Sequence, residues 1–107
     1  MDKEKYIINN YFEKDILKMT EFLKIDFYDY CDIVFKNKLY LKNTSNIARK
    51  WEEKEDDIIK KYSHDLNIRY ISNMLWRSYY ATYQRVRYLG IDNLIQKRGK
   101  KKWMKKN

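Results

Sequence analysis

The chain contains no proline and only two glycines, Gly90 and Gly99. Small β-sheet proteins need frequent tight turns, and glycine and proline make most of them, so this composition favours helices. Hydrophobic residues make up 44% of the 107 residues, which suffices for a core in one compact unit or in two very small ones. We therefore expect an all-α protein.

The first half of the sequence has apolar residues at helical spacing in three segments. They predict helices over roughly 3–11 and roughly 15–23, and a third helix that is capped by Asp26 and ends near residue 38. The polar stretch 41–46, "LKNTSN", is typical of a connector.

Three more helices are predicted in the second half. Ser45 is a suitable N-cap for a helix that reaches to about residue 61, with Trp51 in its apolar stripe. Asn67 can cap the next helix. Ser78 can cap the last one, which ends at Gly90, where a glycine is favourable just past a helix C-terminus.

The two halves also resemble each other, because residues 6–23 align with residues 57–75. We predict two tandem three-helix units, 1–43 and 44–95, which form a repeat of roughly 40–45 residues. A basic C-terminal tail, 96–107, follows them. The alternative is that any two short three-helix units look alike at this level.

Charge is distributed unevenly along the chain, whose formal net charge is +9. Residues 1–45 hold eight lysines and eight acids, whereas residues 66–107 hold eleven cations against Asp92 alone. A polyanion should therefore meet the second half first. The tail has seven cations and no acid, and such runs bind nucleic acid by counterion release or serve only to keep a chain soluble. A membrane-surface role for Trp103 and Met104 is a weaker alternative, because the apolar area is small.

The helix expected after Ser78 has two different faces. Thr82, Val86 and Leu89 share an inner stripe, while the opposite stripe places polar and aromatic side chains outward. In a major groove, Gln pairs with adenine, Arg pairs with guanine, and Tyr contacts thymine methyls or phosphates. The predicted base contacts are Tyr80, Tyr83, Gln84 and Arg87. The alternative is a solvated polar face that happens to be basic.

Other cations are candidates for phosphate contacts. Arg77 and Arg85 lie near the turn and the core edge, where they suit either phosphates or structural ion pairs. The predicted phosphate contacts are Arg69, Arg77, Arg85, Lys97, Arg98, Lys100, Lys101 and Lys102.

The third helix of the first half has the opposite charge. Asp26, Asp29 and Asp32 follow one another at intervals of three residues, and carboxylates in these positions would repel phosphates. This half is therefore expected to contact a protein partner or a second copy of the chain. The predicted contacts are Phe27, Tyr28 and Tyr30. The alternative is an ordinary helical face that is buried on the second unit.

Residues 51–91 carry a recognisable pattern. Trp51 precedes an acidic run, and "LWRSYYATYQRVRYLGI" follows at 75–91. This pattern resembles the Myb/SANT-like helix-turn-helix (homeodomain-like) family, especially its small prokaryotic and phage members. The resemblance implies a three-helix fold whose third helix binds DNA. There are two departures: Trp76 stands in place of a small turn residue, and Glu52 stands where the family usually has a Ser or Thr cap.

Catalytic and metal-binding patterns are not found in the sequence. His64 and Cys31 are single and far apart, so they predict neither a zinc site nor an internal disulfide, and no phosphate-binding loop or nucleophile motif is present. No apolar run is long enough for a membrane span. We therefore predict a non-enzymatic, cytoplasmic protein without cofactors, nucleoid-associated if it is bacterial or phage-derived.

The predicted role is a small regulator or accessory factor that binds duplex DNA. One alternative is a phage-encoded interaction protein that inhibits a host nucleic-acid enzyme or defence complex. Another is RNA binding, because basic surfaces with aromatic side chains also suit single strands.

Overall fold

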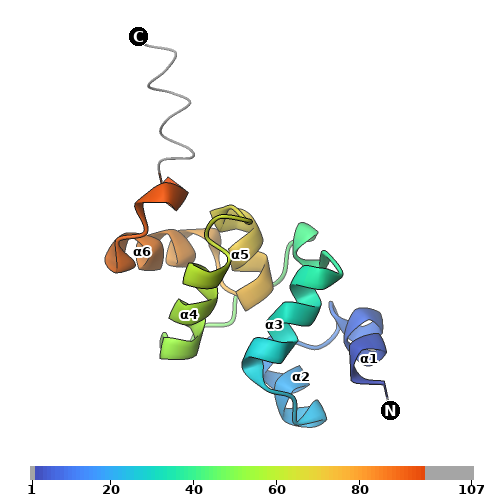
Figure 1. The fold of residues 1–107 in the computed structure, drawn as a ribbon. Coiled ribbons are helices and arrows are strands. Elements are labelled where there is room, and N and C mark those ends of the chain that lie inside the picture. The colour runs from blue at the N-terminus through green and yellow to red at the C-terminus, as the bar shows by residue number, and fades with distance from the viewer. Residues whose placement is uncertain (1, 96–107) are drawn as a thin grey trace.

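The computed structural model describes residues 2–95, and within this range the chain is helical and contains no strand (Figure 1). The prediction of an all-α fold is therefore confirmed. The elements in chain order are α1 (Lys3–Asn10), α2 (Ile16–Leu23), α3 (Phe27–Lys36), the 3-10 helix η1 (Leu39–Leu41), α4 (Glu53–Lys61), α5 (Ile68–Leu75) and α6 (Tyr79–Leu89). A further helical turn covers residues 92–95.

Polar side chains begin three of these helices as the sequence predicts. Asp26, Asn67 and Ser78 each accept a hydrogen bond from a backbone N–H in the first turn of α3, α5 and α6, which satisfies a donor that has no partner within the helix. At its other end, α6 stops at Gly90, whose φ of 72° is the left-handed conformation that glycine adopts without steric cost. These four predicted helix ends are confirmed.

The α2–α3 and α5–α6 pairs are built alike. In each pair a helix of eight residues ends on a left-handed residue, Lys24 or Trp76, and the next helix starts three residues later. The backbone N–H after each left-handed residue bonds back into the helix, from Ile25 to Thr20 O and from Arg77 to Ser72 O. Ile16 and Ile68, which begin α2 and α5, are 52 residues apart, so the spacing is longer than the predicted repeat.

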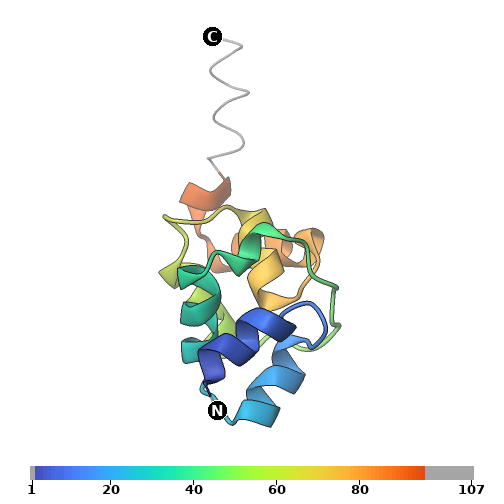
Figure 2. The ribbon, with the colours of Figure 1, turned by 90° about the vertical axis from the view of Figure 1, so that its right-hand side faces the viewer.

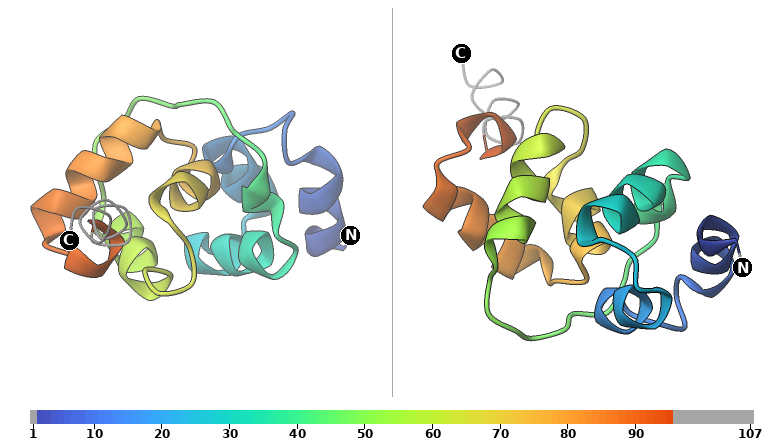
Figure 3. Two further views of the ribbon diagram at one scale, coloured as in Figure 1. Left: turned by 90° about the horizontal axis from the view of Figure 1, so that it is seen from above. Right: turned by 60° about the horizontal axis from the view of Figure 1, so that its bottom comes forward.

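The segment between the halves, residues 42–52, differs from the prediction. Ser45 caps no helix: α4 starts only at Glu53, and Trp51 lies in the extended segment before it. The reason is that this segment's polar groups bond to the end of α5 and the start of α6. Ile47 N donates to Trp76 O over 2.9 Å, and Ser78 N donates to the Asn46 side chain. Figure 3 shows the segment as a long arc past the start of α6.

Helix α5 is the centre of the molecule, between α3 and η1 on one side and α6 on the other (Figures 1 and 2). The carbonyl of Asn73 accepts hydrogen bonds from Tyr11 Oη and Thr44 Oγ1, and the Asn73 amide donates to Tyr40 O. The Trp76 ring is also buried, with its centroid 5.8 Å from that of Tyr11. Because both halves contribute to one buried cluster, each half provides part of the core of the other.

Candidate nucleic-acid interface

The outward face of α6 is formed by four side chains. Tyr80 and Tyr88 are 70% and 75% exposed, and Gln84 and Arg87 are exposed beside them. The opposite face anchors the helix, with Thr82 and Val86 fully buried. The structure therefore brings together three of the predicted base contacts, Tyr80, Gln84 and Arg87, on one accessible surface. Sequence reasoning missed Tyr88, although it follows Tyr80 and Gln84 at the i, i+4, i+8 spacing of one helical stripe.

Tyr83 and Arg69 lie along one edge of this surface. The Tyr83 ring is half-buried and stacks nearly parallel on Tyr79, with centroids 6.5 Å apart. Arg69 is exposed in the first turn of α5, and its guanidinium lies 4.9 Å from the Tyr79 ring centroid. A cation–π contact of this kind holds the guanidinium next to α6 while leaving it accessible. Arg69 therefore keeps an exposed charge, and its contact with phosphate stays a prediction.

Arg77 has a different role from the predicted phosphate contact. Its side chain is almost completely buried, and its Nε and Nη2 donate to the two carboxylate oxygens of Glu55 over 2.8 and 2.9 Å. The remaining donor groups bond to the carbonyls of Arg49 and Lys50. This arrangement is the structural ion pair that the sequence left open, and it corrects the assignment of Arg77 to phosphate.

A second arginine, Arg49, contacts the same carboxylate. It donates to Glu55 Oε1 over 2.9 Å and also to the carbonyls of Leu75 and Trp76 at the end of α5. Burial lowers the pKa of Arg49, and the charge of Glu55 opposes this effect. The cluster of Arg49, Glu55 and Arg77 ties the extended segment to α4 and α5. The sequence analysis did not predict this cluster, although the acidic run 52–57 supplies the carboxylate that the two arginines share.

Arg85 is also paired inward. Its guanidinium makes two hydrogen bonds of 2.8 Å to Asp56, which raise the pKa of Arg85. It lies between two rings, 4.6 Å from the Tyr88 centroid and 5.5 Å from that of Trp51, and Arg77 contacts the Trp51 ring at 3.8 Å. The pairing with Asp56 is the structural ion pair that the sequence left open for Arg85, and it favours that role over a phosphate contact.

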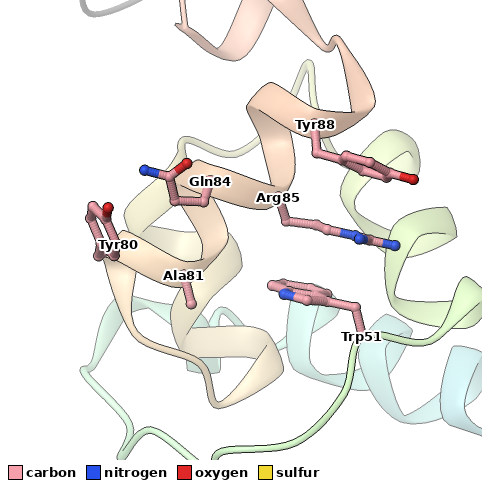
Figure 4. Close-up of a pocket in the computed structure, with 6 residues that line it drawn as sticks. All are labelled: Trp51, Tyr80, Ala81, Gln84, Arg85 and Tyr88. Carbon is pink, nitrogen blue, oxygen red and sulfur yellow. The ribbon is translucent and has the colours of Figure 1, made fainter.

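These stacked groups form one wall of a shallow hollow beside α6 (Figure 4). Tyr80 and Gln84 stand on its other side, and the small side chain of Ala81 lies between the walls. The six residues that line the hollow are Trp51, Tyr80, Ala81, Gln84, Arg85 and Tyr88. Apolar and aromatic surface therefore continues from the outward face of α6 onto Trp51.

The predicted protein contacts of the first half are mostly buried. Tyr30 is fully buried and Phe27 is 7% exposed, because α3 packs against α4 and α5, as the alternative interpretation held. This corrects both as contact residues. Tyr28 remains exposed, and its hydroxyl donates to Asp57 over 2.7 Å, a bond that raises the pKa of Tyr28 to about 12.

Other apolar side chains of the first half are exposed instead. They lie on α1, on α2 and at the short segments that follow α1 and α3: Ile8, Phe12, Leu17, Phe22 and Leu41. Some have aromatic or cationic neighbours, since Phe22 stacks on Tyr6 and Lys42 lies 5.4 Å from the centroid of Phe12. The first half therefore keeps accessible apolar surface, but at positions that the sequence did not predict.

Residues 2–95 contain neither a metal-binding cluster nor a membrane-spanning helix. The histidine, cysteine and acidic side chains there form no group of three that could hold a metal ion. No helix in this range is both long and apolar enough to cross a membrane. The predicted phosphate contacts of the tail, Lys97, Arg98, Lys100, Lys101 and Lys102, lie outside the described residues.

Comparison of the chain with protein-family models, with curated proteins and with solved structures finds no match. The resemblance to Myb/SANT-like proteins therefore stays a prediction, and the surface itself is the basis for a functional proposal.

Proposed function

We propose that the protein is a non-enzymatic regulator or accessory factor that binds duplex DNA, with the outward face of α6 in the major groove. The observation that carries this proposal is the exposure of Tyr80, Gln84 and Arg87 on one stripe of a helix of eleven residues. A helix of this length fits the major groove, and these side chains can contact base edges there. In this proposal α5 and α6 act as a helix-turn-helix, and α1–α3 form a degenerate unit of the same kind.

Charge on this side of the molecule supports the proposal. The sequence has no acid between Leu66 and Ile91, and two acids of the preceding run, Glu55 and Asp56, pair inward with arginines. Helices α5 and α6 therefore contain no carboxylate that would repel a phosphate backbone. Arg69 and the basic tail are proposed to contact phosphates, which fix the position of a protein on DNA without reading its sequence.

The base contacts divide by chemistry. Gln84 is proposed to pair with adenine and Arg87 with guanine, because each side chain can form two hydrogen bonds to the major-groove edge of that base. Tyr80 and Tyr83 are proposed to contact thymine methyls or nearby phosphates. Each good bidentate contact contributes about 1–3 kcal/mol of discrimination against the wrong base.

The test starts from selection of bound duplexes from a random pool, followed by fluorescence anisotropy with the selected duplex at several salt concentrations. Arg87→Ala and Gln84→Ala are expected to lose preference for the selected sequence, by about tenfold or more per contact. Lys18→Ala is the matched control for lost charge, because Lys18 is exposed on α2 in the half whose net charge is zero.

Three results would contradict the proposal. They are the failure to enrich any sequence, tighter binding to single-stranded DNA or RNA of the same sequence, and equal behaviour of Arg87→Ala and Lys18→Ala. A DNA-binding protein that contacts several phosphates must also lose affinity steeply as salt increases, so an affinity that is insensitive to salt would count against it.

The exposed apolar side chains of the first half favour a second candidate, an interaction protein that docks on another protein. Phe12 and Phe22 are 46% and 59% exposed, which is unusual for phenylalanine. The discriminating test is binding to candidate nucleic-acid enzymes after nuclease treatment. Binding that survives nuclease and is lost in Phe12→Ser and Phe22→Ser, but not in Arg87→Ala, would favour this function over DNA binding.

A further inference from the structure

The hollow over Ala81 differs chemically from the rest of the proposed DNA-binding face. Its charged member, Arg85, is neutralised by Asp56, and the other groups along its walls are rings and the Gln84 amide. A phosphate has no free cation to pair with there. The hollow therefore suits an apolar group, and Gln84 stands at its edge to bond the polar atoms next to that group (Figure 4).

The major groove presents one kind of apolar group, the 5-methyl group of thymine. Ala81 and Gln84 are three residues apart, so their side chains are neighbours on the helix surface and can contact neighbouring base pairs. We propose that the hollow over Ala81 holds the 5-methyl group of a thymine in the base pair next to the one that Gln84 contacts. This inference rests on the proposed DNA binding, and it adds a specificity-determining residue and the base that this residue selects.

One wall of the hollow, formed by Trp51, Arg85 and Tyr88, is held in place by ion pairs with acids of α4. Trp51 lies on the guanidinium of Arg77, which Glu55 holds with two hydrogen bonds, and Arg85 supports Tyr88 from beneath. A wall that is fixed before binding loses little side-chain entropy when a methyl group packs against it. The methyl contact should therefore give a measurable preference, although it is small compared with a bidentate hydrogen bond.

The test uses duplexes in which deoxyuridine replaces thymine, because this change removes the methyl group and keeps every hydrogen-bonding atom. Starting from the selected duplex, each thymine is replaced in turn and the dissociation constant is measured by anisotropy. One position is expected to lose about fourfold in affinity, the value for one buried methyl group.

Ala81→Leu fills the hollow and is the variant that tests the position. It is expected to bind the thymine duplex more weakly than the wild type and to lose the distinction between thymine and deoxyuridine. Ala48→Leu is the matched control, since Ala48 is the other alanine of the chain and is exposed in the segment before α4. This control should keep the wild-type ratio. Circular dichroism of both variants checks their folding, and the wild-type measurement needs no variant at all.

The outcomes separate the two proposals. If the wild type binds the selected duplex but is indifferent to every thymine replacement, the methyl site is refuted and DNA binding stands. An Ala81→Leu variant that keeps the preference for thymine refutes the position of the site. If the wild type selects no duplex, the proposed function fails, and the methyl site fails with it.

Discussion

Replacement of Glu55 by Gln tests whether the buried ion cluster holds the second half together. The Glu55 side chain is only 1% exposed and accepts four hydrogen bonds: two from Arg77, one from Arg49 and one from Glu52 N. Gln has nearly the same shape, but it removes the charge and turns one acceptor oxygen into an NH2 donor. That group then faces N–H donors, and two largely buried guanidinium charges lose their counter-ion.

The size of the effect follows from this geometry. Breaking a buried ion pair by neutralising one partner typically costs about 3–5 kcal/mol, because the remaining charge stays buried without compensation. Stability of a small protein is about 5–15 kcal/mol, so Glu55→Gln should remove a large fraction of it. With an m-value of about 2 kcal/mol/M, the midpoint of urea unfolding falls by about 2 M.

The assay is urea unfolding followed by circular dichroism, with Glu53→Gln as the control. Glu53 belongs to the same first turn of α4 but is exposed, so its replacement should change the free energy of unfolding by less than about 0.5 kcal/mol. The double variant Glu55→Gln/Arg77→Met should be less destabilised than the sum of the two single variants, because it removes a charge together with its partner. Equal midpoints for Glu55→Gln and Glu53→Gln would refute the role assigned to the cluster.

Three further predictions concern the fold. Trp76→Gly should lower the free energy of unfolding in urea by about 2–3 kcal/mol. Glycine relieves about 1–2 kcal/mol of backbone strain at this left-handed position, but loss of the large buried ring costs roughly 3–5 kcal/mol. A variant more stable than the wild type would contradict this. Burial opposes ionisation of Asp32, but hydrogen bonds from Lys61 and Tyr62 outweigh it and hold the pKa of this carboxyl below its usual value. The stability that this carboxylate contributes is present above its pKa in the unfolded chain and is lost as pH falls through its pKa in the folded protein. Asp32→Asn should therefore lower the melting temperature at pH 7 and flatten the decline of the melting temperature below about pH 4. Parallel plots of melting temperature against pH for the variant and the wild type would contradict this. Burial raises the pKa of the Cys31 thiol, so a disulfide reagent at pH 8 should modify it only at the rate of unfolding, and rapid modification of the native protein would show that the site is open.

The helix ends and the faces of α6 could be predicted because they depend on neighbours in the sequence. Ser78 and Asn67 cap helices through their own backbone surroundings, and the burial of Val86 follows from helical spacing alone. The same reasoning failed at Ser45, which has the chemistry of an N-cap. Bonds from its neighbours Asn46 and Ile47 to the start of α6 and the end of α5 keep that segment extended, and these partners are about thirty residues away in the sequence.

The roles of the arginines could not be predicted for the same physical reason. Arg77, Arg85 and Arg87 look alike in sequence, yet the first two pair with acids of α4 and only Arg87 stays exposed. Which arginine is neutralised depends on which side chains lie within reach of Glu55 and Asp56 of α4, and not on local spacing. Tyr30 shows the same effect, because its helix is covered by the second half and the residue becomes part of the core.

Because Arg77 and Arg85 each pair with an acid of α4, most of the affinity for DNA should come from the tail, and the preference among sequences should come from α6. Residues 66–91 hold four arginines, and two of these are neutralised internally, so α5 and α6 present only Arg69 and Arg87 to a phosphate backbone. The seven cations of residues 96–107 are then the main source of counterion release. A chain that ends at residue 95 should therefore bind every duplex more weakly and with a shallower salt dependence, while its preference among sequences is unchanged. Loss of that preference together with the tail would place the sequence readout in the tail instead of on α6.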